Sequence, residues 1–262
     1  MKHLLSIFIL LITTSLFSQS EPYSFRKYAN VESFYQLLTK EAIEVGVKNN
    51  VPPAALLAIA GLESGYGSGY VAQITGNILS LNAGKGDKKL PPLYLPTCGD
   101  KDVVLFDSTE IKSCPKKNLN WKQRPSSLKH DYRPAPYAGT IKNLAYLKHN
   151  PNQRILAQKA CLNGFARRWL SKNNKNNVFR DASLWLDSLV NKEGTKALFS
   201  KEVNIKFISM IGGHPNSFNF REIWPKKVKR IMNKVGLVNL CSEMYEKKLS
   251  FEQAWKNNSI ND

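Results

Sequence analysis

Acidic residues are scarce in this sequence. It has 20 Asp and Glu residues against 38 Lys and Arg residues, which gives a formal net charge of +18. An excess of positive charge indicates attraction to anionic polymers and says nothing of the fold. The lysines are scattered, and the sequence contains no helix-turn-helix, zinc-finger or other nucleic-acid signature, so we expect no specific nucleic-acid partner.

Histidine and cysteine are also few, with four of each. No Cys-x-x-Cys pair is present and the histidines are scattered, so the spacing typical of a metal site is missing. We therefore expect no metal and no cofactor. The sequence also lacks a Gly-x-Ser-x-Gly elbow, which argues against a serine hydrolase of the type that carries it.

Long apolar runs are missing except at the N-terminus. There, Lys2 precedes an apolar run over residues 4–17, and small residues follow at Ser18 and Ser20. This layout predicts a secretory signal peptide over residues 1–20. The alternative, a membrane anchor, is disfavoured because the run is short and diluted by hydroxyl residues. We expect a periplasmic or secreted protein without a membrane span.

The four cysteines are an even number, which in an exported chain suggests disulfides. Three pairings are possible. We favour Cys98–Cys114, which closes a local loop, together with Cys161–Cys241.

Apolar periodicity predicts a mostly α (α+β) fold with a small β element. One domain covers residues 21–256, and a flexible tail follows at 257–262. Residues 83–100 and 113–137 read as irregular, and β-branched residues between turn formers predict a short strand or hairpin over 101–112. Helices are expected over 31–48, 54–63, 140–149, 152–171, 181–199, 203–211, 222–235 and 238–256.

One carboxylate interrupts an apolar helix face. Leu56, Ile59 and Glu63 share a stripe on the helix expected over 54–63. A carboxyl group at the edge of a core has a raised pKa and can donate a proton to a leaving group. Gly65 and Gly67 permit a sharp chain reversal beyond it. The alternative is a helix-terminal glutamate that points into solvent.

The segment Glu63-Ser-Gly-Tyr-Gly resembles the Glu-Ser-Gly-aromatic-Gly signature of the bacterial endo-β-N-acetylglucosaminidases, glycoside hydrolase family 73. Thr75-Gly-Asn77-Ile-Leu-Ser80-Leu resembles the family's Asn-Leu-Phe-Gly-Ile-Lys stretch, with Ser80 in place of glycine. The resemblance implies a lysozyme-like fold. It also implies that Glu63 is the general acid that cleaves the β-1,4 bond after N-acetylglucosamine in peptidoglycan.

The resemblance also suggests a second acidic residue. The family places one in a β-hairpin, often within a Thr-Glu pair, and Asp107-Ser-Thr109-Glu110 resembles that pair. Glu110 is our candidate for positioning or activating water, and Asp107 is the runner-up. The alternative is that both are exposed hairpin acids.

Further stretches match in part. Phe179-Arg180 resembles the start of the family's Phe-Arg-x-Tyr-x-Ser stretch, and residues 224–231 resemble its closing helix. The family's Gly-Tyr-Ala-Thr-Asp segment is absent and residues 211–220 stand in its place. An aromatic residue of that segment, Tyr66 or Tyr137 could replace its tyrosine.

Substrate-binding candidates follow from the same resemblance and from the sugar-binding faces of aromatic rings. For Tyr66, Tyr70 and Trp224, core packing is the alternative. The candidates are Tyr66, Tyr70, Asn77, Tyr137 and Trp224.

Residues 115–177 read as an insertion relative to a compact family member. The expected partners are peptidoglycan glycan strands and, through the basic surface, anionic envelope polymers, and we expect a monomer. Two other functions stay open. One is a lytic transglycosylase, although its usual Gly-Leu-Met-Gln stretch is absent. The other is a non-catalytic wall-binding or envelope protein on the same fold.

Overall fold

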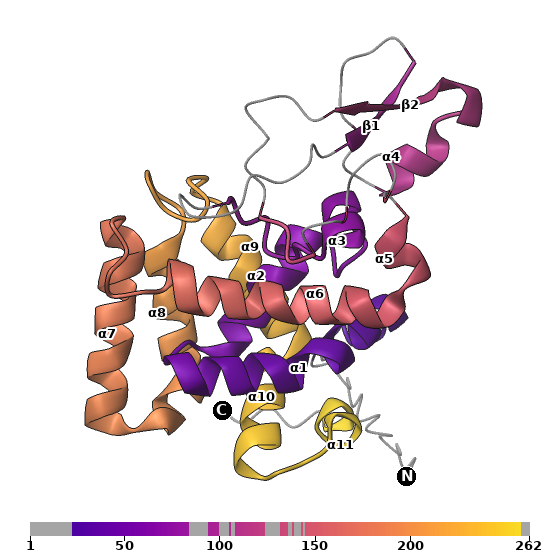
Figure 1. Ribbon diagram of the computed structural model, residues 1–262. Coiled ribbons are helices and arrows are strands. Elements are labelled where there is room, and N and C mark those ends of the chain that lie inside the picture. The colour runs from indigo at the N-terminus through magenta and orange to yellow at the C-terminus, as the bar shows by residue number, and fades with distance from the viewer. Residues whose placement is uncertain are drawn as a thin grey trace, which may run out of the picture.

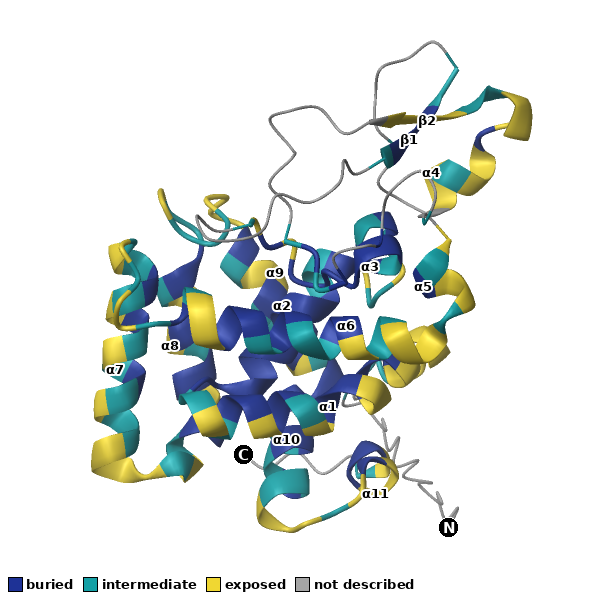
Figure 2. Ribbon diagram, viewed as in Figure 1, coloured by how far each residue is buried: buried dark blue, intermediate teal, exposed yellow. Residues whose placement is uncertain are grey.

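The helix α2 (Pro53–Ser64) lies at the centre of the molecule. A computed structural model describes residues 23–83, 94–99, 105, 108–123, 132–135, 138, 143 and 145–257 of the chain. Every residue of α2 from Pro53 to Gly61 is buried, because its sequence is apolar or small on all sides. The expected apolar stripe is therefore part of a helix that is buried on all sides as far as Gly61, and Figure 2 shows it enclosed by the others.

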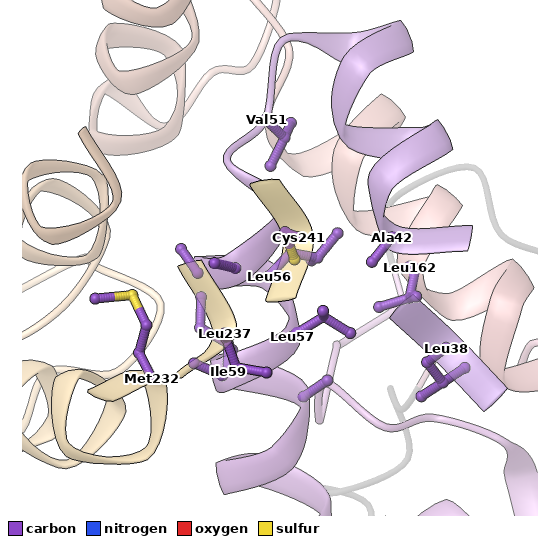
Figure 3. Packing of buried hydrophobic residues seen from close by; sticks show 14 of the residues in the cluster. Leu38, Ala42, Val51, Leu56, Leu57, Ile59, Leu162, Met232, Leu237 and Cys241 are labelled. Atoms are coloured by element: carbon purple, nitrogen blue, oxygen red, sulfur yellow. The ribbon is translucent and has the colours of Figure 1, made fainter. Parts of the chain in front are cut away.

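Other helices surround α2, and the closest contacts come from α1, α8, α9 and α10. Figure 3 shows Leu56, Leu57 and Ile59 within this core, together with side chains from the surrounding helices. The surrounding elements are α1 (Ala29–Asn49), α6 (Pro151–Gly164), the π-helical turn η3 (Phe165–Trp169), α7 (Asn177–Glu193), η4 (Thr195–Phe199), α8 (Lys201–Ile211), α9 (Trp224–Val235), α10 (Leu237–Glu246) and α11 (Phe251–Lys256).

A small β unit lies above α3 (Tyr70–Thr75) in Figure 1. Strands β1 (Tyr94–Cys98) and β2 (Leu119–Gln123) pair antiparallel, with Cys98 opposite Leu119. Two short elements precede β2 in the chain, α4 (Ser108–Ser113) and η1 (Lys116–Asn118). Tyr70, Ile74 and Leu95 form a separate apolar cluster, which holds the β unit against α3. The mostly α fold with a small β element is confirmed.

The position of the strands differs from the prediction. The strand expected over 101–112 is wrong where the structure describes it, since residues 108–113 are the helix α4. The strands lie instead within the two stretches that were read as irregular. The disulfide Cys98–Cys114 joins the end of β1 to the end of α4, with the Cα atoms 5.9 Å apart. The two cysteines are 16 residues apart in the chain, so the disulfide closes the local loop expected from the sequence.

Two of the predicted helices are interrupted. The helix expected over 238–256 is two helices, because Ser250 and Gln253 form a capping box that starts α11. The helix expected over 181–199 ends at Glu193, where Gly194 has a φ of 81°. Of the helix expected over 140–149, the structure describes the last part, which is the helix α5 (Tyr146–His149).

The pairing Cys98–Cys114 is confirmed, and the pairing Cys161–Cys241 is wrong. Cys161 on α6 and Cys241 on α10 are both free and buried. Burial raises the pKa of the Cys161 thiol to about 12, which makes this thiol a poor nucleophile.

The signal peptide expected over residues 1–20 lies outside the described residues. Among the helices that the structure describes, none has the length and apolar character needed to cross a membrane.

Candidate active site

Glu63 occupies the last turn of α2, where the buried helix reaches the surface of the core. Its side chain is partly buried, while Ala60 before it and Ser64 after it are fully buried. The helix therefore carries a carboxyl group from an apolar interior to a boundary with solvent.

The Glu63 carboxylate has one direct partner on another helix. Trp224 begins α9, and its indole Nε1–H donates to Glu63 Oε1 over 2.7 Å. Burial raises the pKa of Glu63, and the indole hydrogen bond and the charge of Arg221 oppose this rise. The net shift is upward because desolvation of the charged form is the largest effect. This is the arrangement expected of a carboxyl group that must keep its proton.

The Glu-Ser-Gly-Tyr-Gly motif forms a tight left-handed turn directly after Glu63. Gly65, Tyr66 and Gly67 have φ values of 54°, 55° and 75°. The Ser64 hydroxyl donates to the Ala60 carbonyl over 2.6 Å and accepts from the Gly67 N–H over 2.8 Å. A left-handed φ is unfavourable for tyrosine and is held here by the surrounding contacts. The motif thus ends α2 immediately beyond Glu63 and turns the chain toward α3.

Trp224 is held in place by the loop between α8 and α9. Only 3% of Trp224 is exposed, and a Cβ atom on Gly212 would lie 2.2 Å from its six-membered ring. Phe218 packs on the indole with ring centroids 5.4 Å apart. The loop closes on itself, since the Phe218 N–H donates to the Ile211 carbonyl over 2.7 Å. Segment 211–220 therefore positions Trp224, whose burial favours a supporting role over stacking against a sugar.

Two of the predicted sugar-binding tyrosines lie close to the turn. Tyr66 is half-buried against Phe34 and Tyr35, in edge-to-face contacts at about 6 Å. Burial raises the pKa of Tyr66, and the charge of Arg230 opposes this rise. The Tyr70 ring is 7% exposed, and its hydroxyl donates to the Tyr94 carbonyl over 3.2 Å. Tyr66 is therefore the more accessible of the two rings.

Asn77 is buried and its side chain is fully used within the fold. Its Nδ2 donates to the carbonyls of Leu81 and Tyr132, each over 2.9 Å. Its Oδ1 accepts from the Leu81 N–H over 3.0 Å. These bonds close the turn over residues 77–81 and attach it to Tyr132, so the geometry favours a structural role for Asn77.

The predicted second acid lies on the β unit. Glu110 is an exposed residue of α4, so it belongs to a helix and not to the expected hairpin. Tyr137 and Asp107, the other two candidates, lie outside the described residues. The structure therefore joins Glu63 to Trp224, while Tyr66 lies in the turn that follows Glu63 and Tyr70 lies at the start of α3.

Three residues near this site have no role in the sequence prediction. Trp121 on β2 is 37% exposed, and its ring lies 5.3 Å from that of Tyr70. Arg221 is exposed and close enough to Glu63 to affect its pKa. Phe218 packs against Trp224. Trp121 could have been proposed from the sequence as an aromatic residue near the site. Arg221 and Phe218 could not, because their positions depend on the fold of the loop between α8 and α9.

The described residues show no cluster of three or more His, Cys, Asp or Glu side chains able to hold a metal ion. Three grooves lined wholly by described residues lie away from Glu63. The largest, of about 780 Å³, lies between α1 and the α10–α11 region.

No protein-family model and no curated protein matches this chain. Among solved structures, the chain is similar to the catalytic domain of the autolysin Auto from Listeria monocytogenes, with a TM-score of 0.42 and 13% sequence identity. This similarity covers 80% of this chain and 87% of that one. A similarity of this size leaves the function to be argued from the residues of the site.

Proposed function

We propose that this chain is a peptidoglycan hydrolase that cleaves the β-1,4 bond after N-acetylglucosamine, with Glu63 as the general acid. The observation that carries the proposal is the position of Glu63 at the end of a buried helix, where burial raises its pKa. The motif Glu63-Ser-Gly-Tyr-Gly supports the choice of substrate, through its resemblance to the endo-β-N-acetylglucosaminidases.

Glycoside cleavage needs an acid that protonates the leaving oxygen while positive charge develops on the sugar ring. A neutral Glu63 can supply that proton. Trp224 holds Oε1, and among the described residues no hydrogen bond engages Oε2. The proton is therefore best placed on Oε2. After transfer, the indole N–H and the charge of Arg221 stabilise the carboxylate that forms.

The second catalytic group stays a choice between two routes. Glu110 can act on water only if the β unit brings it toward the sugar, since it is exposed on α4. The substrate's own acetamido group can instead attack the anomeric carbon, and this route needs Glu63 alone. The two routes predict different effects of Glu110→Gln. The substitution abolishes activity if Glu110 acts on water, and it leaves activity unchanged if the acetamido group attacks.

The N-terminal segment and the positive charge bear on where the chain acts. We propose that the chain is exported as a monomer after loss of residues 1–20, with residues 115–177 as an insertion in a lysozyme-like domain. The full chain has a formal charge of +18, and loss of residues 1–20 removes only Lys2, so the strong positive charge that remains would hold such a protein near anionic envelope polymers.

The test is mass spectrometry of the muropeptides released from purified peptidoglycan by the wild type, Glu63→Gln and Glu110→Gln. We expect reducing N-acetylglucosamine ends from the wild type, and a loss of about 100-fold or more in Glu63→Gln. The exposed Glu44→Gln on α1 is the matched control and should keep wild-type activity. Products that end in 1,6-anhydro-muramic acid would instead assign a lytic transglycosylase. Equal binding without digestion by any of these proteins would assign a wall-binding module.

A further inference from the structure

A second groove lies beside the loop that holds Trp224. It has a volume of about 360 Å³, within the range of ligand sites in proteins. Asparagines from two segments, residue 82 and residues 173–176, line it together with Arg168 and Trp169, and no acidic residue is among its lining residues. Amide groups around an indole ring are suited to a neutral, hydroxyl- and amide-bearing ligand.

The residues that line this groove contact the loop that positions Trp224 in the candidate active site. Trp169 packs against Phe218 with ring centroids 6.4 Å apart, and Phe218 packs against Trp224. Asn176 in the groove wall donates through Nδ2 to the Asn216 carbonyl over 2.7 Å. One loop, residues 212–223, therefore positions both Trp224 beside Glu63 and one wall of the groove.

Two of the asparagines are fixed by the fold. Asn174 Nδ2 donates to the Trp169 carbonyl over 2.7 Å, and its Oδ1 accepts from the Asn176 N–H over 2.9 Å. Asn176 also caps α7 by accepting from the Val178 N–H over 2.9 Å. These bonds make the wall rigid before any ligand binds, which lowers the entropic cost of binding.

Two other asparagines keep their amides free. Asn82 and Asn173 are exposed, and they line the groove from two separate segments of the chain. Within the part of the chain that the structure describes, neither side chain has a hydrogen-bond partner. Each therefore offers a donor and an acceptor to a ligand without losing a bond of the fold.

We propose that this groove is a subsite for a distal N-acetylated sugar of the same glycan strand that Glu63 cleaves. The inference rests on the proposed function and extends it from the cleaved bond to the length of strand that is recognised. The acetamido group is a secondary amide, so its C=O and N–H match the free amides of Asn82 and Asn173. The exposed guanidinium of Arg168 at the rim disfavours sugars whose amines are free and positively charged.

The test measures binding without turnover. Calorimetry in the Glu63→Gln background uses a hexamer of β-1,4-linked N-acetylglucosamine, and compares it with the glucose hexamer and with the de-N-acetylated hexamer. We expect Asn82→Ala/Asn173→Ala to bind the acetylated hexamer about fivefold or more weakly. The matched control is Asn152→Ala/Asn233→Ala, two exposed asparagines outside the groove, which should bind it unchanged.

Three results would overturn the subsite: unchanged binding by the Asn82/Asn173 variant, equal binding of the acetylated and glucose hexamers, or binding of a stem peptide alone through the same residues. Failure of the proposed function is a separate result, because it shows as an absence of peptidoglycan digestion by the wild type. Hexamer binding that depends on Asn82 and Asn173 would still stand in that case.

Discussion

At the scale of single residues, the contact between Glu63 and Trp224 balances two opposing effects. Burial favours the neutral carboxyl group, whereas the indole N–H and the Arg221 charge favour the carboxylate. A general acid needs both, since it must hold its proton before the reaction and tolerate a negative charge after the proton leaves. The contact makes separate predictions for stability and for the pH dependence of activity.

Replacing Glu63 by Gln should stabilise the protein at neutral pH. Because the pKa of Glu63 is raised in the folded state, its favourable contribution to folding is present in acid and is lost as the pH rises through that pKa. Glutamine cannot ionise and still accepts the Trp224 hydrogen bond. We expect a higher Tm for Glu63→Gln at about pH 7 and a smaller difference near pH 4. Each kcal/mol gained in the free energy of unfolding raises the Tm of a chain of this size by about 2–4 °C. Glu44→Gln, which changes an exposed carboxylate, is the control in these thermal melts.

Replacing Trp224 by Phe should move the alkaline limb of the pH–activity profile to higher pH. The substitution removes the hydrogen bond that lowers the pKa of Glu63, so the carboxyl group keeps its proton further into the alkaline range. Stability also falls because the smaller ring leaves a cavity, and each profile is therefore normalised to its own maximum. Trp185→Phe on α7 is the control. A limb that moves to lower pH would contradict the assigned direction.

At the scale of the elements, the start of α9 is fixed by a glycine in the preceding loop. Gly212→Ala would place a Cβ atom 2.2 Å from the ring of Trp224. We expect a loss of about 1–3 kcal/mol in the free energy of unfolding, together with reduced activity as the indole shifts from Glu63. The double variant Gly212→Ala/Trp224→Phe should be less destabilised than the sum of the single variants, since the smaller ring relieves the clash. Additive losses in a denaturant series would show that the two residues do not interact.

The β unit should loosen without its disulfide, while α2 stays protected. Cys98 and Cys114 link β1 to α4, and among the described residues a small apolar cluster around Tyr70 and the hydrogen bond from Tyr70 to the Tyr94 carbonyl hold this unit to α3. In Cys98→Ser/Cys114→Ser, we expect faster amide hydrogen exchange at residues 94–98 and 119–123 and little change at residues 54–61. Equal acceleration in α2 would mean that the β unit and the core unfold together.

The same elements explain what the sequence alone could predict. Long amphipathic or apolar segments such as α1 and α2 follow from local patterns, and Glu63 followed from its position at the end of one of them. The strands could not be placed, because β1 contains Pro96 and β2 has little apolar alternation, so that tertiary contacts define both. The sequence alone could not identify the hydrogen-bond partner of Glu63 either. Trp224 is 161 residues away along the chain, and its role depends on the loop at Gly212.

At the scale of the whole molecule, Arg26 joins the described N-terminal end to the C-terminal helices. Its guanidinium donates to the carbonyls of Val235, Ala254 and Asn257 over 2.8 Å, 3.2 Å and 3.1 Å, and also to Trp255. It also lies over the Tyr23 and Trp255 rings. Removing it would leave several carbonyl groups without a partner.

Arg26→Ala should therefore destabilise the protein by more than about 2 kcal/mol, because each buried polar group left unpaired costs about 1–3 kcal/mol. Thermal melts would measure the loss, and hydrogen exchange should locate it in α11 first. Arg26→Lys should recover only part of it, since one ammonium group cannot reach all of these carbonyls. Lys27→Ala, at the next and exposed position, is the control.

The proposed general acid must keep its proton when the substrate binds, and the ionisation of Glu63 can be measured directly. A titration followed by carbon-13 NMR of the Glu63 side-chain carboxyl gives its pKa in the folded protein. We predict a midpoint above the value of about 4.3 for an exposed glutamate, and a higher one still in Trp224→Phe. A midpoint at or below that value would mean that Glu63 is ionised whenever the protein is folded near neutral pH, and would contradict its role as the acid.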